Sequence, residues 1–145
     1  MSQNTEFAYL SIKDRHRIKI MAEHYIIAAL WADAPEGTRP RVTRQAKEKA
    51  LTDCLAFCQA CGPDVLRDVQ RRHADGYGAH PDCGQAFPEF AAMGHDLWLT
   101  RNGHGAGFWD RKELEEGDLG DKLTAIAKGM KEVRFEFYRG WFYLY

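Results

Sequence analysis

The chain has 145 residues, of which 45% are hydrophobic and 28% are charged, so it is long enough to bury a core and has the composition of a globular protein. Its formal net charge of -1 argues against a strongly basic nucleic-acid binder and against an acidic DNA mimic. The four cysteines and the lack of a recognisable signal peptide predict reduced thiols or metal ligands in a cytoplasmic protein. The longest apolar run, residues 25–32, is too short to span a membrane.

The N-terminal part of the sequence predicts helices. A first helix is expected to start at Ser11 or Asp14, whose side chains can cap backbone N–H groups, and to end at residues 31–33. Its second half, residues 25–31, is apolar all round, which indicates a helix sunk in the core. Proline and glycine predict a loop over residues 34–40.

Further helices are expected as far as residue 93. Thr43 is a good N-cap for a second helix that ends at Gly62 and Pro63. A third helix follows directly, because proline is favourable in the first turn of a helix. Residues 88–93 predict a short helix that ends at Gly94.

From residue 95 onward, the hydrophobic period changes to that of strands. A hairpin is expected first, then a helix capped by Asp118, and then a second hairpin that turns at Arg139 and Gly140. The predicted ββαββ segments are residues 95–101, 108–110, 118–130, 131–138 and 141–145.

This order of elements predicts an α+β fold, in which N-terminal helices pack on a small antiparallel sheet. We expect a single domain over residues 1–145, with a helical part over about 11–93 and the ββαββ part over about 94–145.

Residues 94–111, GHDLWLTRNGHGAGFWDR, are the most unusual segment of the chain. The glycines of residues 102–107 fit either a loop of exposed N–H groups that binds an anion or a wide hairpin turn. The turn is favoured, because a phosphate-binding loop normally leads into a helix and this one is expected to lead into a strand.

Imidazoles and carboxylates in the same segment could supply acid–base chemistry. Strand alternation, however, would place His95 and Arg101 on one face and Asp96 on the other. One alternative is therefore an enzyme that acts on a phosphate-containing small molecule or nucleic acid through His95, Arg101, His104 and Asp110.

A second alternative is structural zinc. Cys58, Cys61, His80 and Cys83 have the spacing of a site with three thiolates and one imidazole. Cys58 and Cys54, however, fall on the apolar face of a predicted helix, where a cysteine is usually a small buried hydrophobe. No cofactor is expected, and zinc at these four residues stays an alternative.

A third alternative is a nucleic-acid-binding module with an aromatic stacking platform on the sheet, although packing in the core is the better explanation for strand aromatics. The candidate platform residues are Trp98, Trp109, Trp141, Phe142, Tyr143 and Tyr145. A basic run at the start of the second helix fits a solvated face or the binding of an acidic partner. Its members are Arg39, Arg41, Arg44, Lys47 and Lys49.

The stretches HDLWLTRNGHGAGFWDR and LGDKLTAIAK, and more loosely HYIIAALWAD, resemble a family of small proteins encoded by bacteriophages, prophages and plasmids. The resemblance is specific over residues 94–128 and looser over 24–33. It implies an accessory protein of a mobile element that acts in the bacterial cytosol, and it transfers no established activity to any residue.

The leading hypothesis is a non-enzymatic protein that binds and inhibits a host protein or nucleoprotein complex, for example as an anti-CRISPR or anti-restriction factor. Aromatic residues and arginine dominate interface energetics, so the contact surface is expected within the unusual segment. The candidate contact residues are Trp98, Arg101, Asn102, His104, Trp109 and Asp110.

Overall fold

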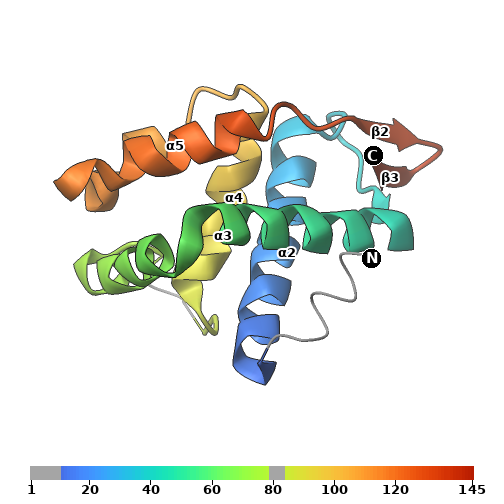
Figure 1. The fold of residues 1–145 in the computed structure, drawn as a ribbon. Coiled ribbons are helices and arrows are strands. Elements are labelled where there is room, and N and C mark those ends of the chain that lie inside the picture. Colours follow the sequence, from blue (N-terminus) through green and yellow to red (C-terminus); the bar gives the residue numbers. More distant parts are fainter. Residues whose placement is uncertain (1–10, 79–83) are drawn as a thin grey trace.

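The computed structural model describes residues 11–78 and 84–145. Four α-helices and three short strands form the regular structure of these residues, together with single-turn 3-10 helices at His73–Asp75, Phe108–Asp110, Lys112–Leu114 and Glu116–Asp118. The main elements are α2 (Ile12–Asp33), β1 (Arg41–Val42), α3 (Arg44–Arg72), α4 (Pro88–Arg101), α5 (Leu119–Gly129), β2 (Phe135–Tyr138) and β3 (Trp141–Leu144). The fold is α+β, as predicted: α2 packs on α4, α3 crosses them, and the sheet lies at one end of the molecule (Figure 1).

The sequence signals for α2 and α3 are confirmed. The Ser11 hydroxyl accepts a hydrogen bond from the backbone N–H of Asp14, at 3.1 Å. The Thr43 hydroxyl accepts one from Ala46, at 3.0 Å. Gly62 leaves helical geometry with a φ of 81°, and the chain resumes its helix at Pro63, so α3 consists of two helical halves joined by a kink.

The second half of α2 is not sunk in the core on all sides. Tyr25, Ala28 and Ala29 are fully buried, but Ile27 is 49% and Trp31 74% exposed. The prediction was wrong because a helix at the surface needs only one buried face, and here the outward face is apolar as well.

The largest error concerns α4. The sequence predicted a helix ending at Gly94 and then a strand, but one helix runs from Pro88 to Arg101. Gly94 lies inside it because the backbones of α2 and α4 approach closely there: a Cβ on Gly94 would fall on the carbonyl oxygen of Met21. Residues 108–110 form a 3-10 turn, so the first hairpin of the predicted ββαββ order does not exist.

The C-terminal hairpin is confirmed, with β2 antiparallel to β3 and Phe137 opposite Phe142. The sheet is nevertheless mixed, because β1 joins the free edge of β3 as a parallel strand, giving the order β1-β3-β2. The predicted helix after residue 118 is α5, although the Asp118 side chain makes no capping hydrogen bond.

One hydrophobic core runs through the described residues, from Ile18 in α2 to Leu144 in β3. The indole of Trp98 is fully buried within it and contacts the rings of Tyr25, Phe135 and Phe142. In residues 11–78 and 84–145, no helix has both the length and the apolar composition that a membrane crossing requires.

Candidate functional site

The glycine-rich part of the unusual segment ends a helix. The backbone N–H of His104 donates to Leu99 O at 3.0 Å, and that of Gly103, with a φ of 73°, lies 3.5 Å from Thr100 O. These two bonds are those of a Schellman turn, in which a glycine with positive φ closes the last helical turn. The C-terminus of a helix carries partial negative charge. The glycines therefore have a structural role, but at the C-terminus of a helix and not in the predicted hairpin turn, and an anion would meet an unfavourable field there.

Asp96 is a buried anchor. The carboxylate is 1% exposed, accepts a hydrogen bond from the Tyr77 hydroxyl at 2.8 Å, and is paired with the Arg111 guanidinium, whose Nε lies 3.0 Å from Oδ1. Burial first, and then the neighbouring Asp96, raise the pKa of Tyr77 well above its usual value. Tyr77 precedes α4 in the sequence and Arg111 follows it, so Asp96 joins the helix to the segments before and after it.

Arg101 is a second buried anchor. Its Nη1 lies 3.0 Å from the Tyr25 hydroxyl and 3.3 Å from the Asp53 carboxylate. Its Nε and Nη2 donate to the carbonyl oxygens of Lys131, at 2.8 Å, and Met130, at 3.0 Å. One guanidinium thereby joins α2, α3, α4 and the segment that follows α5.

The remaining polar groups of the segment also have internal partners. Asp33 accepts hydrogen bonds from the Trp98 indole, at 2.7 Å, and contacts Nε2 of His104, at 3.0 Å. The Asn102 amide bridges the carbonyl of Trp98 and the N–H of Val133. Most polar side chains of the segment thus hydrogen-bond within the protein, where they hold the end of α4 and the loops around it in place.

Two further bonds hold the loop that follows α4. The Thr100 hydroxyl accepts from the Phe108 N–H at 3.2 Å. The Asp110 carboxylate accepts from the Gly107 N–H at 3.0 Å. Both bonds lie within residues 100–110, so they fix the turn itself.

The predicted contact residues therefore fall into three groups. Trp98 and Arg101 are buried, and so are not part of a contact surface. Asn102 and His104 are half-buried, while Trp109 and Asp110 are exposed.

The four residues of the enzyme alternative have separate partners. His95 lies against the ring of Trp31, at a centroid distance of 5.8 Å, whereas Arg101, His104 and Asp110 make the contacts described above. No hydrogen bond or ion pair joins any two of the four within the described parts of the chain. The structure does not assemble them into one site.

Of the four residues of the zinc alternative, the structure describes Cys58 and Cys61, whereas His80 and Cys83 lie outside the described residues. Cys58 is buried in α3 with its thiol 3.6 Å from the Met21 sulfur. Burial raises the pKa of the Cys61 thiol to about 12 and that of the Cys58 thiol further. Among the residues that the structure describes, no three His, Cys, Asp or Glu side chains are grouped to hold a metal ion.

The outer surface of the sheet offers a different candidate site. Phe142 and Leu144 point into the core, so the alternate residues of β3 lie on the opposite surface. Aromatic rings and charged groups both lie there. We call this surface the aromatic–arginine face; it consists of Arg41, Arg134, Glu136, Tyr138, Arg139, Trp141, Tyr143 and Tyr145.

Each of its three arginines lies over an aromatic ring. The guanidinium carbon lies 5.2 Å from the ring centroid for Arg139 over Tyr138, 5.8 Å for Arg41 over Trp141, and 5.9 Å for Arg134 over Tyr145. Tyr138 and Tyr145 are each 50% exposed and Trp141 is 38% exposed. Cation–π contacts of this kind hold the cations in place while leaving them open to a partner.

The face carries net positive charge, since Glu136 is its one carboxylate against three guanidinium groups. Arg41 also joins it to the predicted basic run, of which Arg39, Arg44 and Lys47 are exposed as well.

The sequence indicated part of this face, through Trp141, Tyr143 and Tyr145, although a place in the core was the favoured prediction for them. The alternation of Arg134, Glu136 and Tyr138 with apolar residues was the signal that could have found the rest. Arg41 belongs to the face because β1 pairs with β3. A strand of two residues has no hydrophobic pattern from which this pairing could be predicted.

Comparison with known proteins gives no match to any protein-family model, curated protein or solved structure. The resemblance to the family of phage and plasmid proteins stays a prediction.

Proposed function

We propose that this protein is a non-enzymatic binding protein, and that the aromatic–arginine face docks onto an acidic surface of another protein or of a nucleoprotein complex. The observation that carries the proposal is the row of exposed rings with arginines stacked on them. Tryptophan, tyrosine and arginine are the residue types that most often dominate the binding energy of protein interfaces.

The stacking geometry favours a protein partner over a single-stranded nucleic acid. A base needs a free ring face on which to stack. Here an arginine lies over one face of each of Tyr138, Trp141 and Tyr145, and Tyr143 stacks on Tyr145 with ring centroids 6.4 Å apart, so fewer ring faces are left for bases. The guanidinium groups are better placed for carboxylates, which they can bind in a bidentate manner.

The biological setting of the proposal rests on the sequence resemblance over residues 94–128. A protein of that family is encoded by a mobile element and acts in the cytosol of its bacterial host. We propose that binding inhibits a host complex, with CRISPR and restriction systems as the first to test. The internal use of His95, Arg101 and Asp110 supports a mechanism of binding rather than of catalysis.

The first experiment is capture of partners from lysate of a bacterial host with the tagged protein, with and without nuclease. We expect the same protein in stoichiometric amount from both samples. The double variants Tyr138→Ala/Trp141→Ala and Arg41→Glu/Arg134→Glu should reduce its recovery at least tenfold while the circular dichroism spectrum is retained. Loss of all partners on nuclease treatment would instead establish nucleic-acid binding.

The matched control is Trp109→Ala, which removes an exposed tryptophan from the other candidate surface. Recovery of the partner should be unchanged. If Trp109→Ala abolishes recovery and Tyr138→Ala/Trp141→Ala does not, residues 102–110 form the contact surface and the assignment to the sheet is wrong.

Inhibition is tested by phage plating on a host that carries an active defence system. Expression of the protein should raise the efficiency of plating at least tenfold, and Tyr138→Ala/Trp141→Ala should return it to the value without the protein. An unchanged efficiency against both CRISPR and restriction hosts would remove these two systems as targets.

A further inference from the structure

The strand β2 forms an open edge of the sheet. The strand order β1-β3-β2 leaves one side of β2 without a neighbouring strand, and this side lies at the periphery of the molecule (Figure 1). The far side of β3, in contrast, is covered. There the N–H of Thr43 donates to Phe142 O at 3.2 Å, and the side-chain amide of Gln45 bonds both backbone groups of Leu144.

A two-residue turn joins β2 to β3. Arg139 and Gly140 both have positive φ, of 49° and 81°, as in a type I′ turn. In such a hairpin, the residues on either side of the turn, Tyr138 and Trp141, form a hydrogen-bonded pair, and these pairs recur at every second residue. The even-numbered residues of β2 therefore bond to β3.

The odd-numbered residues of β2, Phe135 and Phe137, consequently direct their N–H and carbonyl groups away from β3. The bond from the Tyr145 N–H to the Arg134 carbonyl, at 2.8 Å, fits the same alternation. Within residues 11–78 and 84–145, no other group hydrogen-bonds to these outward-facing groups. A row of unpaired backbone groups at a sheet edge is a template for a further strand.

Opposite charges lie beside this edge. The Glu136 carboxylate accepts a hydrogen bond from the Tyr145 hydroxyl at 3.2 Å, and the Arg139 guanidinium lies over the ring of Tyr138 at 5.2 Å. Neither Glu136 nor Arg139 forms an ion pair with another described residue. The edge therefore carries an anion and a cation that are both available to a partner.

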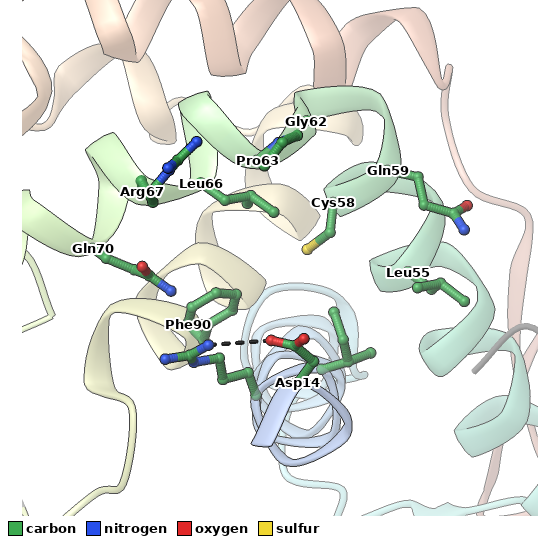
Figure 2. Close-up of a pocket in the computed structure, with 12 residues that line it drawn as sticks. Asp14, Leu55, Cys58, Gln59, Gly62, Pro63, Leu66, Arg67, Gln70 and Phe90 are labelled. Atoms are coloured by element: carbon green, nitrogen blue, oxygen red, sulfur yellow. Dashed lines mark hydrogen bonds and ion pairs between the residues drawn. The ribbon is translucent and has the colours of Figure 1, made fainter. Parts of the chain in front are cut away.

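The groove between α2, α3 and α4 contrasts with this edge. In that groove, Asp14 pairs with Arg17 at 3.1 Å, which is the dashed line in Figure 2. Arg67 of α3 pairs with Asp64. The edge of β2 differs because its charges and its backbone groups both lack partners.

We infer that β2 pairs antiparallel with β2 of a second copy of this chain, with a two-fold axis between the two Phe137 residues. Each Phe137 then exchanges both backbone hydrogen bonds with its counterpart, and Phe135 lies opposite Arg139 of the second copy. The two sheets become one continuous sheet. This pairing also covers the half-buried rings of Phe135 and Phe137.

Two features of the edge exclude the neighbouring registers. Pairing Phe135 with Phe135 of the second copy would extend the contact to Val133, whose N–H is already bonded to the Asn102 side chain at 2.9 Å. Pairing Phe135 with Phe137 would place Glu136 directly opposite Glu136 of the second copy, and like charges in that position are destabilising.

The register centred on Phe137 avoids both problems and brings opposite charges together. It places Glu136 opposite Tyr138 of the second copy in a pair without backbone hydrogen bonds, where side chains are closest. The Arg139 guanidinium that lies over this Tyr138 ring is then next to the Glu136 carboxylate. The two-fold axis repeats the contact, so the edge is complementary to itself.

This inference goes beyond the proposed binding of a partner, and it does not depend on it. Dimerisation would place two aromatic–arginine faces side by side on one sheet. It is tested with the purified protein alone, so its failure would leave the capture of a partner from lysate unaffected.

The first test is sedimentation velocity of the purified protein, which should show a monomer–dimer equilibrium with a Kd below about 500 µM. Glu136→Arg and Arg139→Glu each bring like charges together across the axis and should weaken the dimer at least tenfold. The double variant Glu136→Arg/Arg139→Glu restores opposite charges and should dimerise like wild type. A wild-type protein that stays monomeric, or a double variant no better than the single ones, would overturn the inference.

Arg41→Glu is the matched control. It makes the same change of charge as Arg139→Glu on the same surface, but on β1, at the opposite edge of the sheet. Dimerisation should be unchanged. If Arg41→Glu weakens the dimer as much as Arg139→Glu does, the copies meet through the surface of the sheet and the assignment to the β2 edge is wrong.

A pair of cysteines tests the register. Residues opposite each other in a non-hydrogen-bonded pair have Cα atoms about 4.5 Å apart, which a disulfide can span. With Cys83 replaced by alanine, oxidation of mixed Glu136→Cys and Tyr138→Cys proteins should give more than the statistical share of the mixed dimer. The described native cysteines are buried and should not compete. An excess of the Glu136→Cys homodimer would mean that the glutamates lie opposite each other, and the inferred register would be wrong.

Backbone hydrogen exchange identifies the strand that pairs. The N–H groups of Phe135 and Phe137 should exchange at least threefold more slowly in concentrated than in dilute solution. The N–H of Tyr138, which is bonded within the hairpin, should be unaffected. A dimer that leaves Phe135 and Phe137 unprotected would place the interface elsewhere and contradict the inference.

Discussion

The Arg101 guanidinium is the point at which the polar chemistry of residues 94–111 has its largest structural effect. It balances the Asp53 carboxylate, which is 4% exposed and also accepts a hydrogen bond from the Tyr25 hydroxyl at 3.0 Å. Without Arg101, the only remaining ion-pair partner of Asp53 among the described residues is the partly exposed Lys49, so the buried carboxylate loses its buried counter-charge. We expect Arg101→Met to lower the free energy of unfolding, measured by urea denaturation, by about 3 kcal/mol.

Lys49→Met is the control for this prediction. Lys49 pairs with the same Asp53 carboxylate at 2.7 Å, but its side chain is 35% exposed, so solvent screens the interaction. We expect a loss of at most about 1 kcal/mol. The double variant Asp53→Leu/Arg101→Met should be less destabilised than Arg101→Met, since it leaves no buried charge. Equal destabilisation by the two single variants would contradict the assigned role of Arg101.

His95 is the titratable group of the unusual segment whose environment most clearly favours its neutral form. Burial, to which the Trp31 ring contributes, lowers the pKa of His95 from its usual 6.5. The Asp96 carboxylate opposes this shift, whereas Arg111 and His24 add to it. Nuclear magnetic resonance titration should place its midpoint below 6.5. Trp31→Ala should move the midpoint back towards 6.5, and Trp109→Ala should not.

The sign of the matching stability effect follows from linkage. The unfolded chain takes up a proton at His95 near pH 6.5, whereas the folded chain does so only at lower pH. His95 therefore favours unfolding as the pH falls below about 6.5. As the pH falls below 6.5, wild type should lose more stability than His95→Asn. If wild type instead gains stability relative to His95→Asn as the pH falls, this sign is wrong.

The crossing of α2 and α4 depends on a glycine. A Cβ at position 94 would overlap the Met21 carbonyl oxygen, and the backbone rather than a flexible side chain would have to move. We expect Gly94→Ala to lower the free energy of unfolding by about 3 kcal/mol. Gly129→Ala is the control, because no atom lies within 4 Å of a Cβ at the end of α5, and it should stabilise by about 0.5 kcal/mol.

This same contact explains why the sequence misplaced α4. Gly94 suggested a helix end, although it is required for the packing of two helices. Leu97, Trp98 and Leu99 are all buried, so the helix shows no hydrophobic stripe and its polar residues imitate the alternation of a strand. Periodicity reports the contrast between core and solvent, and a helix enclosed on nearly all sides offers little contrast.

Other elements were predictable because their signals are local. The caps at Ser11 and Thr43 and the break at Gly62 depend on neighbouring backbone groups, and the alternation around Phe135 reports one buried sheet surface. The parallel pairing of Arg41 with Trp141 joins residues far apart in sequence, so no local pattern indicates it. The aromatic–arginine face depends on the same long-range pairing, so the sequence indicated a candidate site in residues 94–111 instead.

The first half of α3 should protect its thiols from chemical modification. Cys54 is fully buried, Cys58 is 6% and Cys61 8% exposed, and burial raises the pKa of all three thiols. The reactive species is the thiolate, of which Cys61, with a pKa of about 12, has about one part in ten thousand at pH 8. We expect iodoacetamide to leave these three cysteines unmodified at pH 8 until urea unfolds the protein, as read by peptide mass spectrometry. Rapid labelling of Cys54 in folded protein would show that α3 opens locally.

For the whole molecule, these buried neutral groups set an alkaline limit on stability. Cys54, Cys58 and Cys61 keep their protons when folded, but in the unfolded chain they ionise near pH 8.5. Tyr25 and Tyr77 behave in the same way above about pH 10. Because the unfolded state then binds fewer protons than the folded state, stability falls as the pH rises, and it is fully present only below the pKa of the unfolded groups.

The magnitude of this effect makes it measurable. Each group contributes about 1.4 kcal/mol per pH unit between its unfolded and folded pKa, so the three thiols together contribute about 4 kcal/mol per unit above pH 9. A domain of ordinary stability, about 5–15 kcal/mol, should therefore lose a measurable part of its stability above pH 9. Cys61→Ala removes one of the three protons and should reduce the slope by about a third. A urea midpoint that stays constant between pH 8 and pH 10 would mean that the thiols can ionise without unfolding, and that the core around α3 is more open to water than its burial indicates.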